Sequence, residues 1–235
     1  RSRGLRVKRT GTTPKVAEID FLTPLHTATK RDYVERVVSH DKAACAEVAR
    51  QWGFDYWDGD RHYGYGGYTY DGRWRVVAEA MTDHYNLTAG DHVLDIGCGK
   101  GFLLYEFTQV VPGIKVTGID ISDYGTANAK DEVRPFLQVG NCQSLPFRDA
   151  SFDFVYSLNV FHNLRNFELD AALREMQRVR RGGAFVCVES YRNEREKANL
   201  LYWQLTCMSF MDTEEWAWEY RRAGYNGDYG FIFFE

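Results

Sequence analysis

Residues 92–101 read HVLDIGCGKG, and this stretch decides the fold. It is a short apolar strand that ends in a carboxylate and runs into three alternating glycines. Glycines let the backbone approach a ligand closely at the turn between a strand and a helix. A second acid, Asp120, ends the next apolar stretch, and an acid roughly 20 residues further on is placed to hold ribose hydroxyls. The pattern therefore predicts a site for a nucleoside-like cofactor.

The spacing of the glycines indicates which cofactor is bound. A dinucleotide site favours G-x-G-x-x-G, and its third glycine would fall at position 102, which is Phe102. Asp95 also lies beside the loop where a pyrophosphate would sit, and its carboxylate would repel that group. S-adenosylmethionine, which has a cationic amino acid tail and no phosphate, fits these residues better. A nicotinamide-dependent oxidoreductase stays as an alternative.

At this point the chain resembles the class I S-adenosylmethionine-dependent methyltransferases of the small-molecule type. The resemblance includes VGNCQSLPF at 139–147, the family's loop beside adenine, and SFDFV at 151–155, its fourth strand. RRGGAFV at 180–186 resembles its turn into the fifth strand. The resemblance covers residues 73–191 and implies a methyltransferase enzyme on a Rossmann-like three-layer sandwich.

The order of apolar stretches agrees with this α/β fold class. Strands and helices alternate, which predicts a mostly parallel, doubly wound sheet with helices on both faces. Ligands of such sheets bind beyond the carboxyl ends of the strands, where the strand order reverses. The expected strands are 92–97, 115–121, 136–140, 152–158 and 184–190, and the expected helices are 100–109, 124–132 and 168–179.

The C-terminal part predicts one more helix and one more strand. Asp212 and Glu215 form a capping-box pattern before a helix over 213–223, which ends at Gly224. The stretch FIFFE at 231–235 reads as a strand. The family usually closes its sheet with two strands after this helix, the last one antiparallel, but this sequence has clear room for one.

The first 72 residues predict a cap on this core. Residues 29–52 have helical spacing with a break near 39–41, and 53–72 mix glycine with aromatics without a regular period, which indicates a long loop. The loop could fold over the cofactor or substrate as a lid, or it could brace the sheet. We therefore expect an N-terminal tail, helix and cap loop over 1–72 and a cofactor-binding core over 73–235.

Composition excludes several classes of protein. A chain of 235 residues with 44% hydrophobic residues can form a sizeable core, and a net charge of −4 argues against a nucleic-acid binder. Neither a membrane-spanning run nor a signal-peptide pattern is present. The five widely spaced cysteines form no C-x-x-C pair, so we expect no metal site and a cytoplasmic protein. The chain begins with Arg, as a processed chain or a piece of a longer one would.

The resemblance assigns cofactor contacts to ten residues. Asp120 would accept the ribose hydroxyls, Ile121 would cover adenine, and Asp95 would accept a hydrogen bond from the cofactor's amino group or a bound water. An arginine near the start of the helix over 72–87 would pair with the methionyl carboxylate, and Arg61 or Arg75 could replace Arg73 there. Asn141 stands where the family more often has an acid. The expected cofactor-binding residues are Arg73, Asp95, Gly97, Gly99, Gly101, Asp120, Ile121, Asn141, Cys142 and Asn159.

His162 is the first candidate for a general base, because the unperturbed pKa of histidine lies near the operating pH. It could equally be a structural histidine in the turn after the fourth strand. Direct displacement on a sulfonium depends more on alignment than on a base. Further candidates for proton handling are Glu189, Tyr191, His62 and His26.

These residues predict methyl transfer to an O, N or C atom of a small molecule. The aromatic stretches 54–70 and 202–210 would form the acceptor pocket and would suit an aromatic ring, a sugar or a cationic amine. A non-catalytic cofactor-binding module of a larger assembly stays as an alternative function. For the oligomeric state, a homodimer stays open. We expect neither nucleic acid nor a membrane as a partner.

Overall fold

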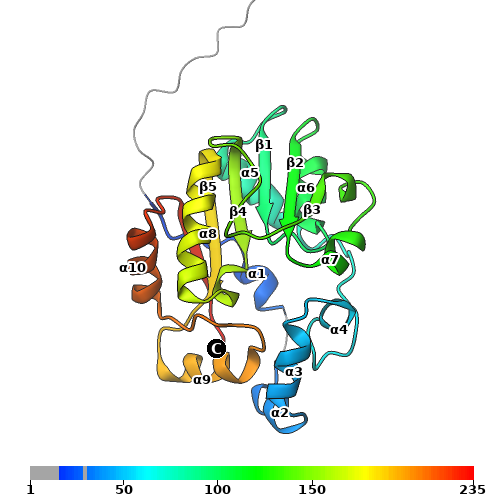
Figure 1. Ribbon diagram of the computed structural model, residues 1–235, viewed down its shortest axis with the longest axis vertical. Helices are drawn as coiled ribbons and strands as arrows, with labels where there is room; N and C mark the ends of the chain where they lie inside the picture. Colours follow the sequence, from blue (N-terminus) through cyan, green and yellow to red (C-terminus); the bar gives the residue numbers. More distant parts are fainter. Residues whose placement is uncertain (1–15, 29–30) are drawn as a thin grey trace, which may run out of the picture.

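The computed structural model describes residues 16–28 and 31–235; the predicted tail over 1–15 lies outside the described residues. Six parallel strands form one sheet in the order β3-β2-β1-β4-β5-β6 (Figure 1). The strand order reverses between β1 and β4, which is where doubly wound sheets bind their ligands. The strands are β1 (His92–Ile96), β2 (Lys115–Asp120), β3 (Leu137–Val139), β4 (Phe152–Leu158), β5 (Arg180–Glu189) and β6 (Asp228–Ile232).

Helices cover both faces of the sheet, so the predicted three-layer α/β fold is confirmed. One core cluster packs α5 and α6 against Phe154 and Phe185, and the other packs α8 and α10 against Val155 and Val186. Neighbouring residues of one strand thus face opposite layers, as a pleated strand requires. The core helices are α5 (Arg75–Tyr85), α6 (Phe102–Val110), α7 (Asp123–Ala127), α8 (Asn166–Val179), α9 (Glu194–Trp203) and α10 (Thr213–Ala223), with short 3₁₀ turns η1 (Arg134–Phe136) and η2 (Phe161–Asn163).

The C-terminal elements follow the prediction in part. The Asp212 and Glu215 capping box starts α10, which ends at Gly224 in the left-handed conformation. The last strand is β6, and it begins three residues earlier than the stretch 231–235 predicted. The hydroxyl of Tyr225 donates a hydrogen bond to the Asp228 carbonyl 2.7 Å away, so the chain enters the sheet directly after the helix. Within the described residues, the sheet has no antiparallel strand.

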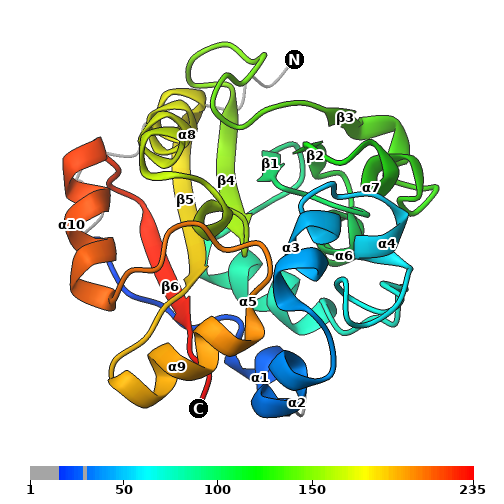
Figure 2. The same ribbon diagram turned by 60° about the horizontal axis from the view of Figure 1, so that its bottom comes forward.

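The N-terminal elements gather near the carboxyl edge of the sheet, where α2 (Tyr33–Val38) packs against α9 and α4 (Phe54–Trp57) lies toward α7 (Figure 2). They are α1 (Thr23–His26), α2 (Tyr33–Val38), α3 (Lys42–Ala49) and α4 (Phe54–Trp57). The expected helical break is present, because Asp41 caps α3 through the amides of Ala43 and Ala44. The segment 53–72, expected to be a loop, contains the short helix α4. Over the described residues no helix is both long and apolar enough to cross a membrane.

Candidate active site

The glycine turn after β1 requires a glycine at position 97. Gly97 has a φ of +86°, and a Cβ there would come within 2.1 Å of Val160 Cγ2. Its amide donates to the Ile119 carbonyl at 2.7 Å, which ties the turn to the end of β2. The turn therefore brings the carboxyl ends of β1, β2 and β4 together around one opening.

A cavity of about 320 Å³ lies at this opening. Asp120, at the end of β2, forms part of its wall. Its two carboxylate oxygens accept hydrogen bonds from the amides of Gly99, at 2.7 Å, and Ser122, at 2.8 Å. Burial raises the pKa of Asp120, while these amide donors favour its charged form. Each carboxylate oxygen has a second lone pair, so Asp120 can still accept hydroxyl donors from a ligand.

Six of the ten predicted cofactor-binding residues line this smaller cavity. Ile121 is 57% exposed, as a side chain that covers a planar ring should be. The side-chain oxygen of Asn141 already accepts the Gln143 amide at 2.8 Å, the local turn that asparagine often makes. The six residues are Gly97, Asp120, Ile121, Asn141, Cys142 and Asn159.

Three of the predicted residues line neither this cavity nor the larger one described below. Asp95 is buried and accepts a hydrogen bond from the Tyr156 hydroxyl at 2.9 Å, and burial raises its pKa to about 8. The indole of Trp57 covers Gly99, since a Cβ on that glycine would lie 2.5 Å from the ring. Gly101 serves as the left-handed N-cap of α6. The structure therefore places these residues behind the site wall.

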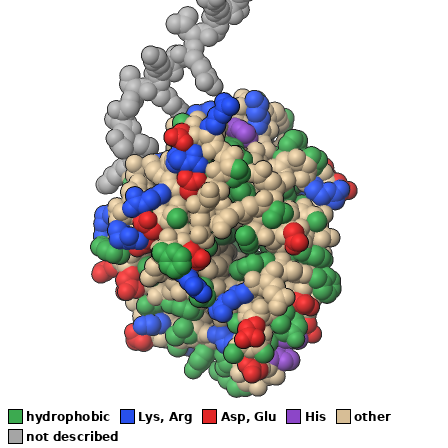
Figure 3. All heavy atoms as spheres, in the orientation of Figure 1, with side chains coloured by type: hydrophobic (Ala, Val, Ile, Leu, Met, Phe, Trp, Pro, Cys, Tyr) green, Lys and Arg blue, Asp and Glu red, His purple; other side chains and the backbone are tan. Residues whose placement is uncertain are grey.

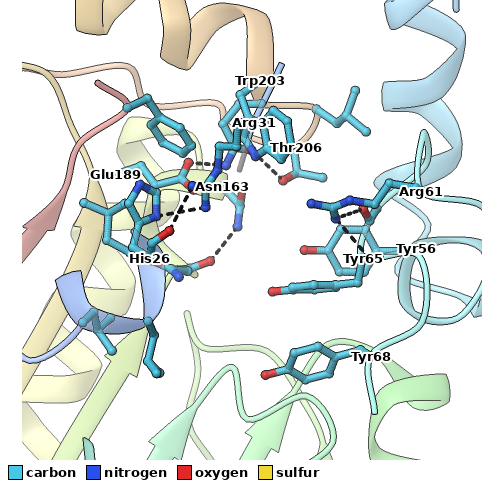
Figure 4. Close-up of a pocket in the computed structure, with 18 of the residues that line it drawn as sticks. His26, Arg31, Tyr56, Arg61, Tyr65, Tyr68, Asn163, Glu189, Trp203 and Thr206 are labelled. Atoms are coloured by element: carbon cyan, nitrogen blue, oxygen red, sulfur yellow. Dashed lines mark hydrogen bonds between the residues drawn. The ribbon is translucent and has the colours of Figure 1, made fainter. Parts of the chain in front are cut away.

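A larger cavity of about 390 Å³ adjoins the first. Both cavities are lined by Tyr56, Tyr65, Asn159 and Asn163, so these residues mark the place where the two cavities meet. Figure 4 shows Tyr56, Tyr65 and Tyr68 pointing from the cap segment into the larger cavity, opposite Asn163 and Glu189. Two ligands, one in each cavity, would therefore contact each other at this junction.

Two amide oxygens at the junction are buried polar atoms without a hydrogen-bond partner in the described part of the chain. They are Oδ1 of Asn159 and Oδ1 of Asn163. Asn159 also has a φ of +58°, a strained conformation for a residue other than glycine. Its backbone N–H donates a hydrogen bond to the Cys187 carbonyl, which holds the residue in place. Buried acceptors are normally satisfied, so these two oxygens suit an N–H or O–H donor from a ligand.

His162 and Glu189 form a buried pair in the wall of the larger cavity. The Glu189 amide donates to His162 Nδ1 at 3.2 Å, which leaves the imidazole proton on Nε2, 3.5 Å from Glu189 Oε2. Burial lowers the pKa of His162 to about 3 and raises the pKa of Glu189 to about 8. Because the free lone pair of His162 is already used, the ring is not arranged to take a proton, and the hydrogen bond to the Glu189 carboxylate comes from Gln204 Nε2.

The remaining candidates lie around or away from the larger cavity. Arg73 lines it and forms an ion pair with Asp71 through its Nε at 2.7 Å. His26 lines it too, and burial lowers the pKa of His26 to about 4. His62 pairs with Asp60 and is not among the lining residues, and neither is Tyr191.

The sequence alone missed the groups that hold the cap segment on the glycine turn. Lys100 Nζ donates to both carboxylate oxygens of Asp58, at 2.7 and 2.6 Å, and to the Tyr68 carbonyl at 2.9 Å. The Trp57 indole donates to Ser122 Oγ at 2.9 Å. In the sequence, the one indication of this contact was the lysine between the glycines. Its partner Asp58 lies 42 residues away, and no helical or strand periodicity relates the two positions.

Comparisons with known proteins agree with this geometry. Residues 94–188, from β1 into β5, match a family model described as a methyltransferase domain. The chain is 34% identical over 128 residues to a demethylmenaquinone methyltransferase of Symbiobacterium thermophilum, covering 51% of this chain and 50% of that protein. It is 32% identical over 122 residues to the 27-O-demethylrifamycin SV methyltransferase of Amycolatopsis mediterranei, covering 46% and 43%. The chain thus spans about half the length of the curated relatives it matches.

Solved structures share the fold over more of the chain. A chain of the Haloferax volcanii complex that contains the Trm112 methyltransferase activator has 25% sequence identity and a TM-score of 0.54. That match covers 83% of this chain and 77% of the other. It therefore reaches beyond residues 94–188 into the flanking elements.

Proposed function

We propose that the chain is a class I S-adenosylmethionine-dependent methyltransferase that methylates a small-molecule acceptor, since residues 94–188 match a methyltransferase domain. The observation that carries the acceptor proposal is the junction of two cavities at Asn159 and Asn163. One cavity has the carboxylate and the exposed apolar side chain that suit an adenosine. The other is large enough for a small organic acceptor, since ligand sites generally measure about 300–1,000 Å³.

The residues of the smaller cavity fit the cofactor. Asp120 would accept the ribose hydroxyls with the lone pairs that the amides leave free. Ile121 would cover one face of adenine, with Asn141 and Cys142 at its edge. The Asn159 and Asn163 oxygens, which have no partner among the described residues, would accept N–H donors from the amino acid tail. When bound, the cofactor supplies a methyl group on a sulfonium, and the chain's own residues hold it at the junction.

Transfer then depends on how the acceptor is aligned in the larger cavity. Tyr56 and Tyr65 reach into it at the junction, where they would fix the acceptor against the cofactor (Figure 4). Alignment of this kind can contribute most of the rate enhancement in a direct displacement. We assign any proton removal to the ionised form of Glu189, which is the minor form at pH 7 because its pKa is about 8 and which grows as the pH rises; Gln204 Nε2 donates a hydrogen bond to this carboxylate.

The names of the relatives support a small-molecule acceptor. One relative is described as acting on demethylmenaquinone and the other on 27-O-demethylrifamycin SV, and both are small organic molecules. On the face seen in Figure 3, basic side chains are interspersed with acidic ones. Nucleic-acid binders instead carry a continuous basic surface.

Calorimetric titration tests the proposal. S-adenosylmethionine and S-adenosylhomocysteine should bind the wild-type chain in the micromolar range, and NAD should not bind. Asp120→Ala should weaken both sulfur compounds by about tenfold or more, through loss of charge-assisted hydrogen bonds. Asp131→Ala, which removes an exposed acid that forms an ion pair with Arg134 away from the cavity lining, should leave their affinity unchanged. Equal binding by the Asp120 variant, with its fold intact, would refute the ribose assignment.

A further inference from the structure

Three arginines converge on one wall of the larger cavity. Arg31 precedes α2, Arg36 lies in α2, and Arg61 follows α4, so three separate positions in the chain supply them. Their guanidinium carbons lie 5.3, 5.1 and 5.3 Å from the ring centroid of Trp203. Three guanidinium groups therefore surround one indole ring.

The hydrogen bonds of Arg36 and Arg61 go to backbone carbonyls, which accept from these arginines without neutralising their charge. Arg36 donates to the Arg61 carbonyl at 2.7 Å and to the Trp203 carbonyl at 3.4 Å. Arg61 donates to the carbonyls of Gly64, at 2.7 Å, and Tyr65, at 3.2 Å. Burial lowers the pKa of Arg36, and repulsion from Arg61 lowers it further. Burial and mutual repulsion both disfavour two guanidinium charges at this place. An anion bound between them would offset that free-energy cost, so the arrangement points to an anion-binding wall.

The other ionisable groups of the cavity leave this wall positive. Glu189 is the acid among the described lining residues, and with a pKa of about 8 it is mostly protonated at neutral pH. His26 and His162 have pKa values of about 4 and 3, so both are neutral there. The fourth lining arginine, Arg73, is already paired with Asp71. The chain as a whole carries a net charge of −4, so this concentration of cations is local.

We infer that the acceptor carries an anionic group, a phosphate or a carboxylate, which Arg36 and Arg61 hold, with Arg31 beside them at Trp203. This inference rests on the proposed function, since it names the class of acceptor for the same site. Guanidinium groups match both oxyanions in geometry and stay charged on burial. Arg61 bonds to the backbone of Tyr65, so an anion at the arginines would place the rest of the acceptor beside Tyr56, Tyr65 and the junction. The same charges would repel a cationic amine placed against this wall.

The test uses four one-ring probes of different charge on the wild-type chain, with and without S-adenosylhomocysteine. Calorimetry in a buffer without phosphate would compare phenyl phosphate, benzoate, benzyl alcohol and benzylamine. We expect phenyl phosphate or benzoate to bind at least tenfold more tightly than benzyl alcohol, and benzylamine to bind most weakly. Tighter binding of one anion over the other identifies the group. Equal binding of the neutral probe, or preference for the amine, would overturn the inference.

Two variants locate the anion. Arg36→Gln and Arg61→Gln should each weaken the preferred anion by about tenfold, and Arg36→Gln should leave S-adenosylhomocysteine binding unchanged. Arg148→Gln, an exposed arginine before the amino end of β4, is the matched control and should change neither. Anion binding that survives in both variants would refute the assignment to this wall. Anion binding without any S-adenosylhomocysteine binding would instead refute the methyltransferase proposal and leave the anion site standing.

Discussion

At the scale of single residues, Gly97 is constrained in two independent ways. Its φ of +86° disfavours any side chain, and a Cβ would also strike Val160. The position thus combines backbone strain with overpacking, which cost about 1–2 and about 1–3 kcal/mol respectively. Gly90 isolates the first effect, because it has a φ of +90° and open space around it.

We predict that Gly97→Ala lowers the free energy of unfolding by about 1–3 kcal/mol more than Gly90→Ala does. Chemical denaturation of both variants measures the difference. Adding Val160→Ala to Gly97→Ala should recover part of the loss, because it removes the atoms that clash. Equal destabilisation by the two glycine variants would show that the contact with Val160 is not a constraint.

Glu189 predicts a pH dependence of stability. Its pKa is about 8 in the folded chain against an ordinary 4.5, because burial penalises its charge. Between these values the folded state keeps a proton that the unfolded state has released. Stability from this group is therefore highest below about pH 4.5 and falls as pH rises toward 8, by up to about 1.4 kcal/mol per pH unit.

Glu189→Gln should remove this contribution, since glutamine does not ionise. The free energy of unfolding, measured at pH 5, 6.5 and 8.5, should fall more steeply with pH for the wild type than for the variant. Parallel curves would mean that Glu189 titrates near its ordinary value and is not poised to take a proton at the site.

At the scale of elements, the cap segment 53–72 is fastened to the core by an ion pair, hydrogen bonds and ring contacts. The buried Lys100 binds Asp58, and Tyr124 donates to the same carboxylate at 2.8 Å. The Trp57 indole donates to the hydroxyl of Ser122, the N-cap of α7, at 2.9 Å. These contacts cross from the cap to the glycine turn and α7, so their loss would free the segment without unfolding the sheet.

Asp58→Asn should therefore lower the free energy of unfolding by about 1–3 kcal/mol, because it leaves the Lys100 ammonium without its carboxylate. A protease that cuts after aromatic residues should cleave within 53–72 faster in this variant. Asp60→Asn is the control, since Asp60 is 67% exposed and pairs with His62 within the cap segment itself. S-adenosylhomocysteine should slow cleavage of the wild type if the segment acts as a lid, whereas equal rates with and without it would favour a fixed brace.

At the scale of the whole molecule, residues 17–19 cover the outer edge of the sheet. The Ile19 amide donates to the Tyr229 carbonyl at 2.8 Å, and the Tyr229 amide donates to the Ala17 carbonyl at 3.0 Å. An uncovered edge strand would present free backbone groups to other chains. This pairing connects the start of the described chain to its last strand.

Gly230→Ala should loosen this cover, because the new Cβ would lie 2.4 Å from the Ile19 carbonyl oxygen. We expect destabilisation of about 1–3 kcal/mol and faster hydrogen exchange at the Ile19 amide. Light scattering should show more self-association as the β6 edge becomes available. Gly53→Ala, which has nothing within 4 Å of its Cβ, should change none of these. Unchanged exchange at Ile19 in the Gly230 variant would contradict the role of this edge.

The sequence by itself determined the α/β core and half of the site. The HVLDIGCGKG stretch, the acid at Asp120 and the alternating strands are local signals, because glycine conformation, strand period and helix caps depend on neighbouring residues. Their positions at the carboxyl ends of parallel strands follow from topology, which is why six of the residues predicted from sequence line the smaller cavity: Gly97, Asp120, Ile121, Asn141, Cys142 and Asn159.

The tertiary structure decided the acceptor side and the roles of buried groups. Nothing local connects Arg31, Arg36 and Arg61 with Trp203, or Lys100 with Asp58, because these pairs form only when the cap folds onto the core. Burial likewise comes from packing, and it reverses the order of two pKa values: that of Glu189 lies above that of His162, whereas in the free side chains it lies below. Periodicity and caps are short-range and can be read along the chain, whereas charge clusters and desolvation are long-range and belong to the fold.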